Sequence, residues 1–200
     1  TRTLDRVEEL TGSQIGFYHF VDPDERTLHL QAWSTATAAV YCKADGAGTH
    51  YDIGRAGVWV DCIHQRRPVI HNDYASLPHR RGMPPGHAAL TRELVVPVFR
   101  SGRIVAVLGT GNKPTDYTEA DVAVVSRFAD LAWDIAERKM VLDRLREADG
   151  RFAAAFEHAP VMITLARYDD GVLLDVNQRF VEVSGFTREE ALGRSVIELG

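Results

Sequence analysis

The thiol of Cys42 is a candidate for redox or metal chemistry. It follows Trp33-Ser34 in a segment that is rich in glycine and alanine and has weak periodicity. A thiolate with a lowered pKa at this place could sense oxidants or ligate haem iron. The alternative is a small buried hydrophobic residue. The other cysteine, Cys62, falls beside Trp59 on the apolar face of an expected helix, where we predict a core role.

His87 follows Gly86 at the end of a long proline-rich loop. Its imidazole could be an axial ligand, could donate a hydrogen bond to a bound molecule, or could fix the loop. His64, His71 and His79 lack the spacing of a metal cluster. The sequence has neither Cys-x-x-Cys nor His-Glu-x-x-His, so we do not expect zinc.

Asn72-Asp73-Tyr74 ends an expected strand and opens the same loop. Its short polar side chains could cap the turn or face a ligand. Arg92 precedes the next strand and could pair with Asp73 or with an anionic group of a ligand. Trp33 and Trp59 could form part of the core or a platform for a ligand.

Composition excludes several classes of protein. The 200 residues are 45% apolar and 26% charged, which is typical of a folded chain. A net charge of −5 without a basic run disfavours nucleic-acid binding. No stretch reaches the ~20 apolar residues of a membrane helix. Two cysteines 20 residues apart exclude a disulfide framework and favour a reducing, cytoplasmic location. The first residues lack a signal-peptide pattern, so we expect a cut N-terminus there.

Alternation, helical spacing and turn residues predict the elements of the first half of the chain. These are helices over 1–10 and 56–66, strands over 15–21, 27–33, 69–71, 93–99 and 104–109, a mostly irregular segment over 34–54, and a long loop over 72–91.

A long helix is predicted from Thr118, where Thr118 and Asp121 have capping-box spacing, to Asp149. At ~1.5 Å per residue it would span about 48 Å. Seven positions step alternately by four and three, and six of them are apolar, as in a two-stranded coiled coil. We expect 124–135 to pack on the domain and 138–145 to reach a partner helix. The seven positions are Val124, Phe128, Leu131, Ile135, Arg138, Leu142 and Leu145.

Beyond Gly150, which should end this helix, the pattern predicts a short helix over 152–156 and strands over 161–166 and 172–176. A helix over 177–184 and a capping box at Thr187-Arg188-Glu189-Glu190 follow. About 50 residues are too few for a complete independent core. We therefore expect exposed apolar surface that is mobile or packed on a partner chain.

Several short motifs in a fixed order resemble one branch of the GAF domains of bacterial and archaeal sensor proteins. The motifs are Ala32-Trp33-Ser34 with Thr37 and Cys42, Ala56-Gly57-Val58-Trp59, Pro68 to Tyr74, Gly86-His87, Arg92 and Gly111-Asn112-Lys113. The resemblance covers residues 1–140 and implies an α+β fold. In that fold a central antiparallel sheet is flanked by helices and followed by an exit helix, here 118–150. It also implies that the first helix is truncated here.

Residues 151–200 resemble the N-terminal half of a PAS domain. The resemblance rests on Phe156 to Pro160, Asp175 to Phe180 and Gly185 to Arg194. It implies an incomplete PAS fold within a longer sensor, whose downstream effector domain would be a histidine kinase or a diguanylate cyclase.

Together these resemblances imply a non-catalytic sensory module of a cytoplasmic signalling protein. A small ligand would bind between the sheet and the 72–91 loop, and a homodimeric helical linker would relay the signal. Haem is a candidate cofactor, with Cys42 or His87 as the metal ligands only in that case. The expected ligand-binding residues are Trp33, Cys42, Trp59, Asn72, Asp73, Tyr74, His87 and Arg92. The expected linker contacts are Phe128, Leu131, Ile135, Leu142 and Leu145.

Two alternatives stay open. The first is a dimerisation and relay module that binds no ligand. The second is a thiol-dependent methionine sulfoxide reductase with the GAF fold, which two cysteines without close spacing disfavour. A covalently attached bilin is also disfavoured, because the family's usual attachment cysteine is absent from residues 79–92.

Overall fold

A computed structural model describes residues 1–41, 50–78, 80 and 89–199. Contacts divide the chain into two units, Thr1–Glu137 and Arg138–Gly200. No helix in the described part of the chain is long and apolar enough to cross a membrane.

The first unit is built on a six-stranded sheet in which all neighbouring strands are antiparallel. This confirms the predicted α+β class with a central antiparallel sheet. In spatial order the strands are β3 (His50–Asp52), β2 (Thr27–Trp33), β1 (Ile15–Val21), β6 (Arg103–Gly111), β5 (Glu93–Arg100) and β4 (Val69–His71). Strand β3 lies within the segment predicted to be mostly irregular.

The hairpin between β5 and β6 is closed by Ser101 and Gly102, which both have positive φ, at 51° and 76°. Two central residues of this kind form a turn whose twist matches that of the flanking strands. The register therefore places Val95 opposite Gly109 and Val96 opposite Leu108. Because side chains alternate along a strand, Leu108 and Gly109 face opposite sides of the sheet.

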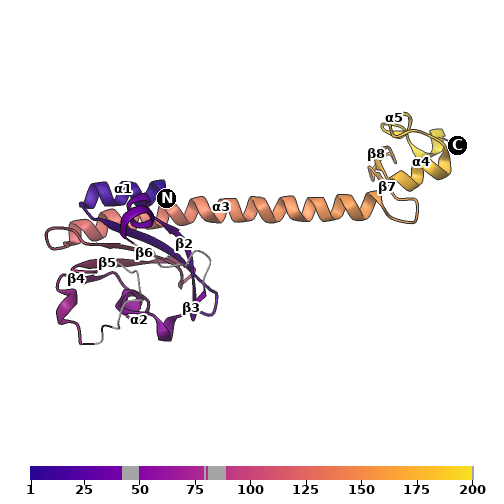
Figure 1. Ribbon diagram of the computed structural model, residues 1–200. Coiled ribbons are helices and arrows are strands. Elements are labelled where there is room, and N and C mark those ends of the chain that lie inside the picture. Colours follow the sequence, from indigo (N-terminus) through magenta and orange to yellow (C-terminus); the bar gives the residue numbers. More distant parts are fainter. Residues whose placement is uncertain (42–49, 79, 81–88, 200) are drawn as a thin grey trace. The chain divides into compact units, whose positions relative to one another are not determined.

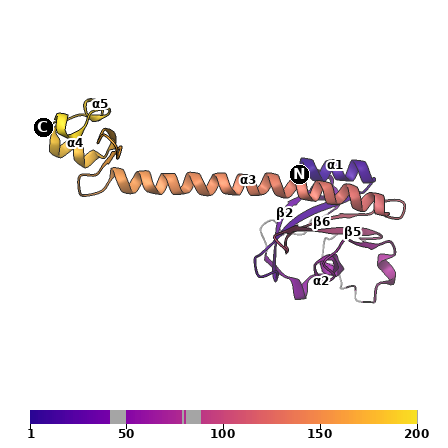
Figure 2. The same cartoon turned by 180° about the vertical axis from the view of Figure 1, so that it is seen from behind.

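Helix α1 (Arg2–Thr11) and the first part of α3 (Glu119–Glu157) lie on one side of the sheet, which we call the helix face (Figures 1 and 2). They pack there because their apolar side chains recur at helical spacing and meet the alternate residues of the strands. The buried core of this face consists of Leu4, Val7, Tyr18, Leu94, Val96, Val98, Ala106, Leu108, Tyr117, Val125 and Ala129.

Helix α2 (Asp61–His64) lies on the opposite side of the sheet, which we call the α2 face (Figure 1). A 3₁₀ turn, η3 (Val58–Val60), precedes it. The prediction of one helix over 56–66 is therefore wrong in length. Gly57 has an extended backbone, with φ −79° and ψ −167°, so the helical segment starts after it. The α2 face buries Phe17, Val21, Leu28, Ile53, Val60, Cys62, Ile63, Val69, Val95, Ile104 and Val107.

Helix α3 continues through Gly150 to Glu157, so the predicted end at Gly150 is wrong. Gly150 does not have a positive φ. A glycine inside a helix costs only about 1 kcal/mol relative to alanine, which is too little to end a long helix.

The segment expected to pack on the domain, 124–135, does meet the sheet, but mostly through other side chains than those of the seam. Phe128 is the seam residue that packs on the core, whereas Leu131 and Ile135 are 50% and 58% exposed. The stripe that meets the sheet lies beside the seam on the helix and shares Phe128 with it. Its members are Val122, Val125, Phe128, Ala129, Ala132 and Trp133.

The second unit contains β7 (Thr164–Ala166), β8 (Leu173–Val176), α4 (Gln178–Ser184), α5 (Arg188–Ala191) and α6 (Val196–Leu199). The capping box at Thr187 and Glu190 is present as predicted. The small core consists of Leu173, Val176, Phe180 and Ala191. Large apolar side chains remain exposed in this unit at Val161, Met162, Leu165, Leu174, Val183 and Ile197.

Candidate functional site

An aromatic cluster lines part of the α2 face. Phe17 and His19 come from β1, Trp33 from β2 and Trp59 from η3. The ring of Phe17 lies 5.6 Å from that of Trp59 and 6.2 Å from that of Trp33, both edge to face. The Phe17 ring also occupies the place that a Cβ at Gly109 would take. Gly109 is thus the residue that lets this ring lie flat across β6.

The cluster combines buried and partly exposed rings. Trp33 and Trp59 are only partly buried, whereas Phe17 and His19 are buried. The His19 ring lies 4.6 Å from that of Trp59. Burial lowers the pKa of His19 to about 3, so its imidazole is neutral at neutral pH. These rings form an apolar wall, against which the apolar part of a ligand could pack.

Ionisable groups gather next to this wall on the same face. Asp61 of α2 and His71 of β4 pair through Oδ2 and Nε2 at 3.3 Å. Glu93, which is the register partner of His71, is 1% exposed. In the described part of the chain, its Oε2 has no hydrogen-bond partner. Burial and the nearby carboxylate of Asp61 raise the pKa of Glu93 to about 8.

Cys62 has the core role that its place on the helix predicted. It is fully buried, and its Sγ donates to the carbonyl of Trp59 at 3.6 Å. Burial raises the pKa of its thiol, with the acidic groups of Glu93 and Asp61 adding to the effect. A thiol in this environment is a poor nucleophile and a poor metal ligand.

The expected residues of the 72–74 segment fulfil different roles. Asn72 donates to the carbonyl of Tyr117 at 3.1 Å and accepts from its backbone N–H at 2.7 Å. The carboxylate of Asp73 accepts from the N–H of Ser76 at 3.3 Å, which caps the 3₁₀ turn η4 (Tyr74–Ser76). Tyr74 is buried, which raises its pKa to about 12. Asn72 and Asp73 therefore fix the chain locally.

Arg92 does not pair with Asp73. Its Nε donates to Asp116 Oδ1 at 2.9 Å. Arg92 directly precedes Glu93, and alternation turns the two side chains to opposite sides of the sheet. Arg92 thus points away from the α2 face, toward the segment that leads into α3.

The two residues nominated for haem, Cys42 and His87, lie outside the described residues. Within the described ranges, no group of three or more His, Cys, Asp or Glu side chains could hold a metal ion. The described cysteine, Cys62, does not fit a haem ligand because it is buried and protonated. No step below is routed through haem.

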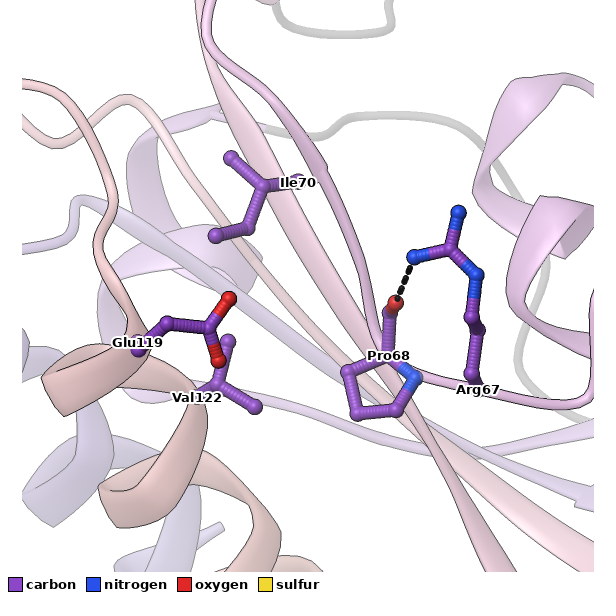
Figure 3. Close-up of a pocket in the computed structure, with 5 residues that line it drawn as sticks. All are labelled: Arg67, Pro68, Ile70, Glu119 and Val122. Atoms are coloured by element: carbon purple, nitrogen blue, oxygen red, sulfur yellow. Dashed lines mark hydrogen bonds between the residues drawn. The ribbon is translucent and has the colours of Figure 1, made fainter.

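A surface pocket of about 310 Å³ lies elsewhere, between β4 and the start of α3 (Figure 3). Pro68 and Ile70 form one wall, and Glu119 and Val122 of α3 form the other. Arg67 completes it, and its guanidinium donates to the carbonyl of Pro68 at 3.3 Å. The expected ligand-binding residues that the structure describes do not line this pocket.

Sequence reasoning did not single out Phe17, His19 or Glu93 as site residues. One signal was present, because 15–21 was expected to be a strand, and residues two apart in a strand, such as Phe17 and His19, face the same side of the sheet. A second signal was the acidic residue that opens the apolar run 93–99. Burial of Glu93 depends on α2 and β4, which the local pattern does not reveal.

Comparison with protein families gives two matches. The GAF domain model matches residues 1–137, and a PAS domain model matches residues 150–199. A relative from Methanosarcina acetivorans, named methyl sulfide methyltransferase-associated sensor, is 38% identical over 154 residues. The match covers 76% of this chain and 15% of the relative, so this chain spans a small part of that protein's length.

Solved structures share the fold at low identity. The GAF domain of a phosphoenolpyruvate-protein phosphotransferase from Coxiella burnetii has a TM-score of 0.56 at 16% identity, covering 68% of this chain and 80% of that one. A free methionine-R-sulfoxide reductase from Neisseria meningitidis has a TM-score of 0.51 at 19% identity, covering 69% of this chain and 77% of that one. These likenesses concern the fold alone. With its first 137 residues matched, the chain belongs to the GAF domain family, and a PAS domain fragment follows the GAF domain.

Proposed function

We propose that this chain is the sensory region of a cytoplasmic signalling protein, in which the GAF domain binds a small ligand on the α2 face. Binding changes the position of α3, and α3 relays the change. The GAF and PAS domains are sensor-type domains, and the relative from Methanosarcina acetivorans is named a sensor. The site residues on this face are Phe17, His19, Trp33, Trp59 and Glu93.

One observation carries this proposal: β1 contributes to both faces of the sheet. Phe17 and His19 belong to the aromatic cluster of the α2 face, whereas Tyr18 and Phe20 point to the helix face. The β1–β2 register shifts between Tyr18 and His19, so the strand pairing is irregular in the middle of these four residues. A ligand that moves Phe17 or His19 therefore acts on the residues that hold α3.

The contacts between the sheet and α3 are specific. The hydroxyl of Tyr18 donates to the carbonyl of Ala129 at 3.0 Å. The ring of Phe20 meets that of Trp133 edge to face, with centroids 5.4 Å apart. A differential affinity for two positions of α3 is all that a switch requires, and couplings of ~1–3 kcal/mol suffice.

A guanidinium clamp supports the same segment of α3. Arg100 of β5 donates to Asp130 at 2.8 Å and to Asp134 at 2.6 Å. These hydrogen bonds tie β5 to the last turns of α3 that pack on the sheet. A movement of the strands would therefore move this segment of α3 with them.

The relay that we propose continues through a homodimer. Beyond the packed stripe, α3 carries exposed apolar side chains, with Leu142 at 46% and Leu145 at 56% exposure. Two such helices would bury these side chains as a coiled coil, as the seam spacing predicts. The effector that receives the signal in the full protein would be a histidine kinase or a diguanylate cyclase.

A relay that binds no ligand is the second candidate. The exposed seam favours it as much as it favours a sensor, but the buried, unpartnered Oε2 of Glu93 favours a ligand. For a sulfoxide reductase, the described residues offer only the protonated, buried thiol of Cys62.

Native mass spectrometry of the purified chain tests the proposal, together with its absorption spectrum before and after addition of haemin. We expect a bound small molecule above the chain mass of 22.2 kDa. If that molecule is haem, it would supply redox or gas-binding chemistry, and a Soret band that fades in Cys42→Ala would identify it. A bare chain that takes up nothing on incubation with a cell metabolite extract would favour the ligand-free relay.

A further inference from the structure

Glu93 stands apart from the other polar groups of the α2 face. It opens β5 between His71 of β4 and Gly111 of β6, its two register partners. Its side chain is almost fully buried, and Oε2 lacks a hydrogen-bond partner in the described part of the chain. A buried polar atom without a partner costs roughly 1–3 kcal/mol, and more if it is charged. Such an atom in a native fold requires an explanation.

Neighbouring groups do not supply the missing partner. Asp61 carries the same sign of charge as an ionised Glu93 and is paired with His71. Cys62 donates to the carbonyl of Trp59. Arg92, the nearest arginine in the sequence, points to the opposite face and pairs with Asp116. Within the described ranges, Glu93 forms no ion pair with a lysine or arginine.

We propose that Glu93 is the anchor for a ligand that carries a protonated amine or amidine on a small apolar body. This inference rests on the proposed function and names the class of ligand. The nitrogen would donate to the unpartnered Oε2, and the body would lie against the aromatic cluster of Phe17, Trp33 and Trp59. Aromatic faces also attract cations, so the wall and the anchor favour the same ligands.

The alternatives are weaker on chemical grounds. An anionic ligand would meet the carboxyl groups of Glu93 and Asp61, and among the described residues no lysine or arginine pairs with Glu93 to compensate that charge. A metal ion needs several ligands, and the described residues hold no group of three that could supply them. A neutral ligand could accept from protonated Glu93, but it would gain only an uncharged hydrogen bond, which is roughly half as strong as a charge-assisted one.

Binding of the cation moves one proton. At neutral pH Glu93 is mainly a neutral acid, because its pKa is raised to about 8. Pairing with an ammonium group requires the carboxylate, so the carboxyl proton passes to the solvent. The groups that face Glu93 are Asp61 and Cys62 of α2, His71 of β4 and Tyr74 of η4. Affinity should therefore rise with pH, by up to about tenfold per unit below about pH 8.

Three probes with one ring and different head groups test the charge preference: benzylamine, benzyl alcohol and benzoate. Isothermal titration with the whole chain at neutral pH should give the order benzylamine, benzyl alcohol, benzoate. We expect about tenfold tighter binding of benzylamine than of benzyl alcohol, which corresponds to about 1.4 kcal/mol. The heat of benzylamine binding should also depend on the ionisation enthalpy of the buffer, since a proton is released.

Glu93→Gln should reduce the affinity for benzylamine about tenfold, to that of benzyl alcohol, and remove the buffer dependence. Glu93→Asp, which keeps the charge on a shorter side chain, should retain part of the preference. Glu119→Gln is the matched control, because it removes an exposed carboxylate from the helix face and should change nothing. Circular dichroism verifies that each variant is folded.

The outcomes separate this inference from the proposed function. Equal affinities for the three probes, tighter binding of benzoate, or an unchanged affinity in Glu93→Gln would overturn the anchor while leaving a ligand site in place. Failure of every probe to bind would overturn the cationic class as well. In each case the proposed function is decided independently, by the molecule that native mass spectrometry finds.

Discussion

The two faces of the sheet are built from the same strands but have different contents. On the helix face, apolar side chains of α1, α3 and the strands fill the core, and the Tyr18 hydroxyl finds a partner on Ala129. On the α2 face, partly exposed tryptophans lie beside Glu93, whose Oε2 is unpartnered within the described part. The helix face is filled by apolar packing, whereas the α2 face holds a buried polar atom without a hydrogen-bond partner in the described part of the chain. Such an atom in a native fold requires an explanation, and a functional role is one. The comparison teaches that position in the sheet alone does not decide what a strand residue does.

The largest effect should come from the packed face. Leu108→Ala removes a fully buried side chain from the middle of the helix-face core. We expect a loss of about 2–5 kcal/mol in the free energy of unfolding, measured by urea denaturation, because the cavity cannot collapse fully. Leu10→Ala, at a 48% exposed position outside the seam, is the control. A loss below about 1 kcal/mol for Leu108→Ala would mean that the helix face is loosely packed.

On the α2 face, the substitution Glu93→Gln should raise the free energy of unfolding instead of lowering it. Burial raises the pKa of Glu93 from 4.5 to about 8, so the folded chain binds more protons than the unfolded chain between these values. Its stability therefore falls as pH rises through this window. Glu93→Gln lacks this penalty. Near pH 4.5 the variant and the wild type should have the same free energy of unfolding. Toward about pH 8, that of the variant should exceed that of the wild type by up to about 1.4 kcal/mol more for each pH unit.

Thermal unfolding of both proteins across that pH range checks the sign and the window. Between pH 4.5 and 6.5, His19 has the opposite effect on stability. Its pKa is lowered to about 3 in the folded chain, so the unfolded chain binds more protons in this range and the free energy of unfolding rises with pH. The difference between variant and wild type cancels this contribution. Parallel pH curves for the two proteins would mean that Glu93 titrates normally.

A smaller effect tests the link between the two faces. Tyr18→Phe removes the hydroxyl that donates to the carbonyl of Ala129. We expect a loss of about 1 kcal/mol in the free energy of unfolding. Hydrogen exchange should accelerate in the segment of α3 around Ala129. Tyr168→Phe, at a fully exposed position, should change neither quantity.

The smallest effect on stability is expected at the exposed apolar side chains of α3. Leu142→Asp alters a side chain that is 46% exposed in a single chain, so the free energy of unfolding of the monomer should change by less than about 0.5 kcal/mol. Its effect should appear in assembly, because a charge in the seam opposes the coiled coil. Sedimentation should show a shift from dimer to monomer, but not for Lys139→Asp, which lies outside the seam. An unchanged dimer in Leu142→Asp would remove the seam assignment.

Much of the fold followed from local patterns. Alternation located β2, apolar runs bounded by turn residues located β1, β5 and β6, and the spacing of Thr187 and Glu190 located the start of α5. The errors arose where tertiary contacts decide. The heptad predicted the seam of α3, but the side chains that meet the sheet belong to a neighbouring stripe that includes Val125 and Ala129.

The candidate site was harder to predict than the fold. Trp33 and Trp59 were expected from motifs and lie in the aromatic cluster. Glu93 escaped notice because a glutamate that opens a strand is usually solvated, and only the packing of α2 and β4 makes it buried. The burial of Glu93 depends on residues that are distant in the sequence, so neither composition nor local spacing predicts it.

The most direct test of the account is fluorine NMR of the chain labelled with fluorotryptophan. Its three tryptophans divide between the faces: Trp33 and Trp59 lie at the site, and Trp133 lies on α3. Titration with benzylamine should shift all three resonances with one dissociation constant, and Tyr18→Phe should reduce only the shift of Trp133. If Trp33 and Trp59 shift while Trp133 stays unchanged, a ligand binds without reaching α3, and the relay through β1 is contradicted.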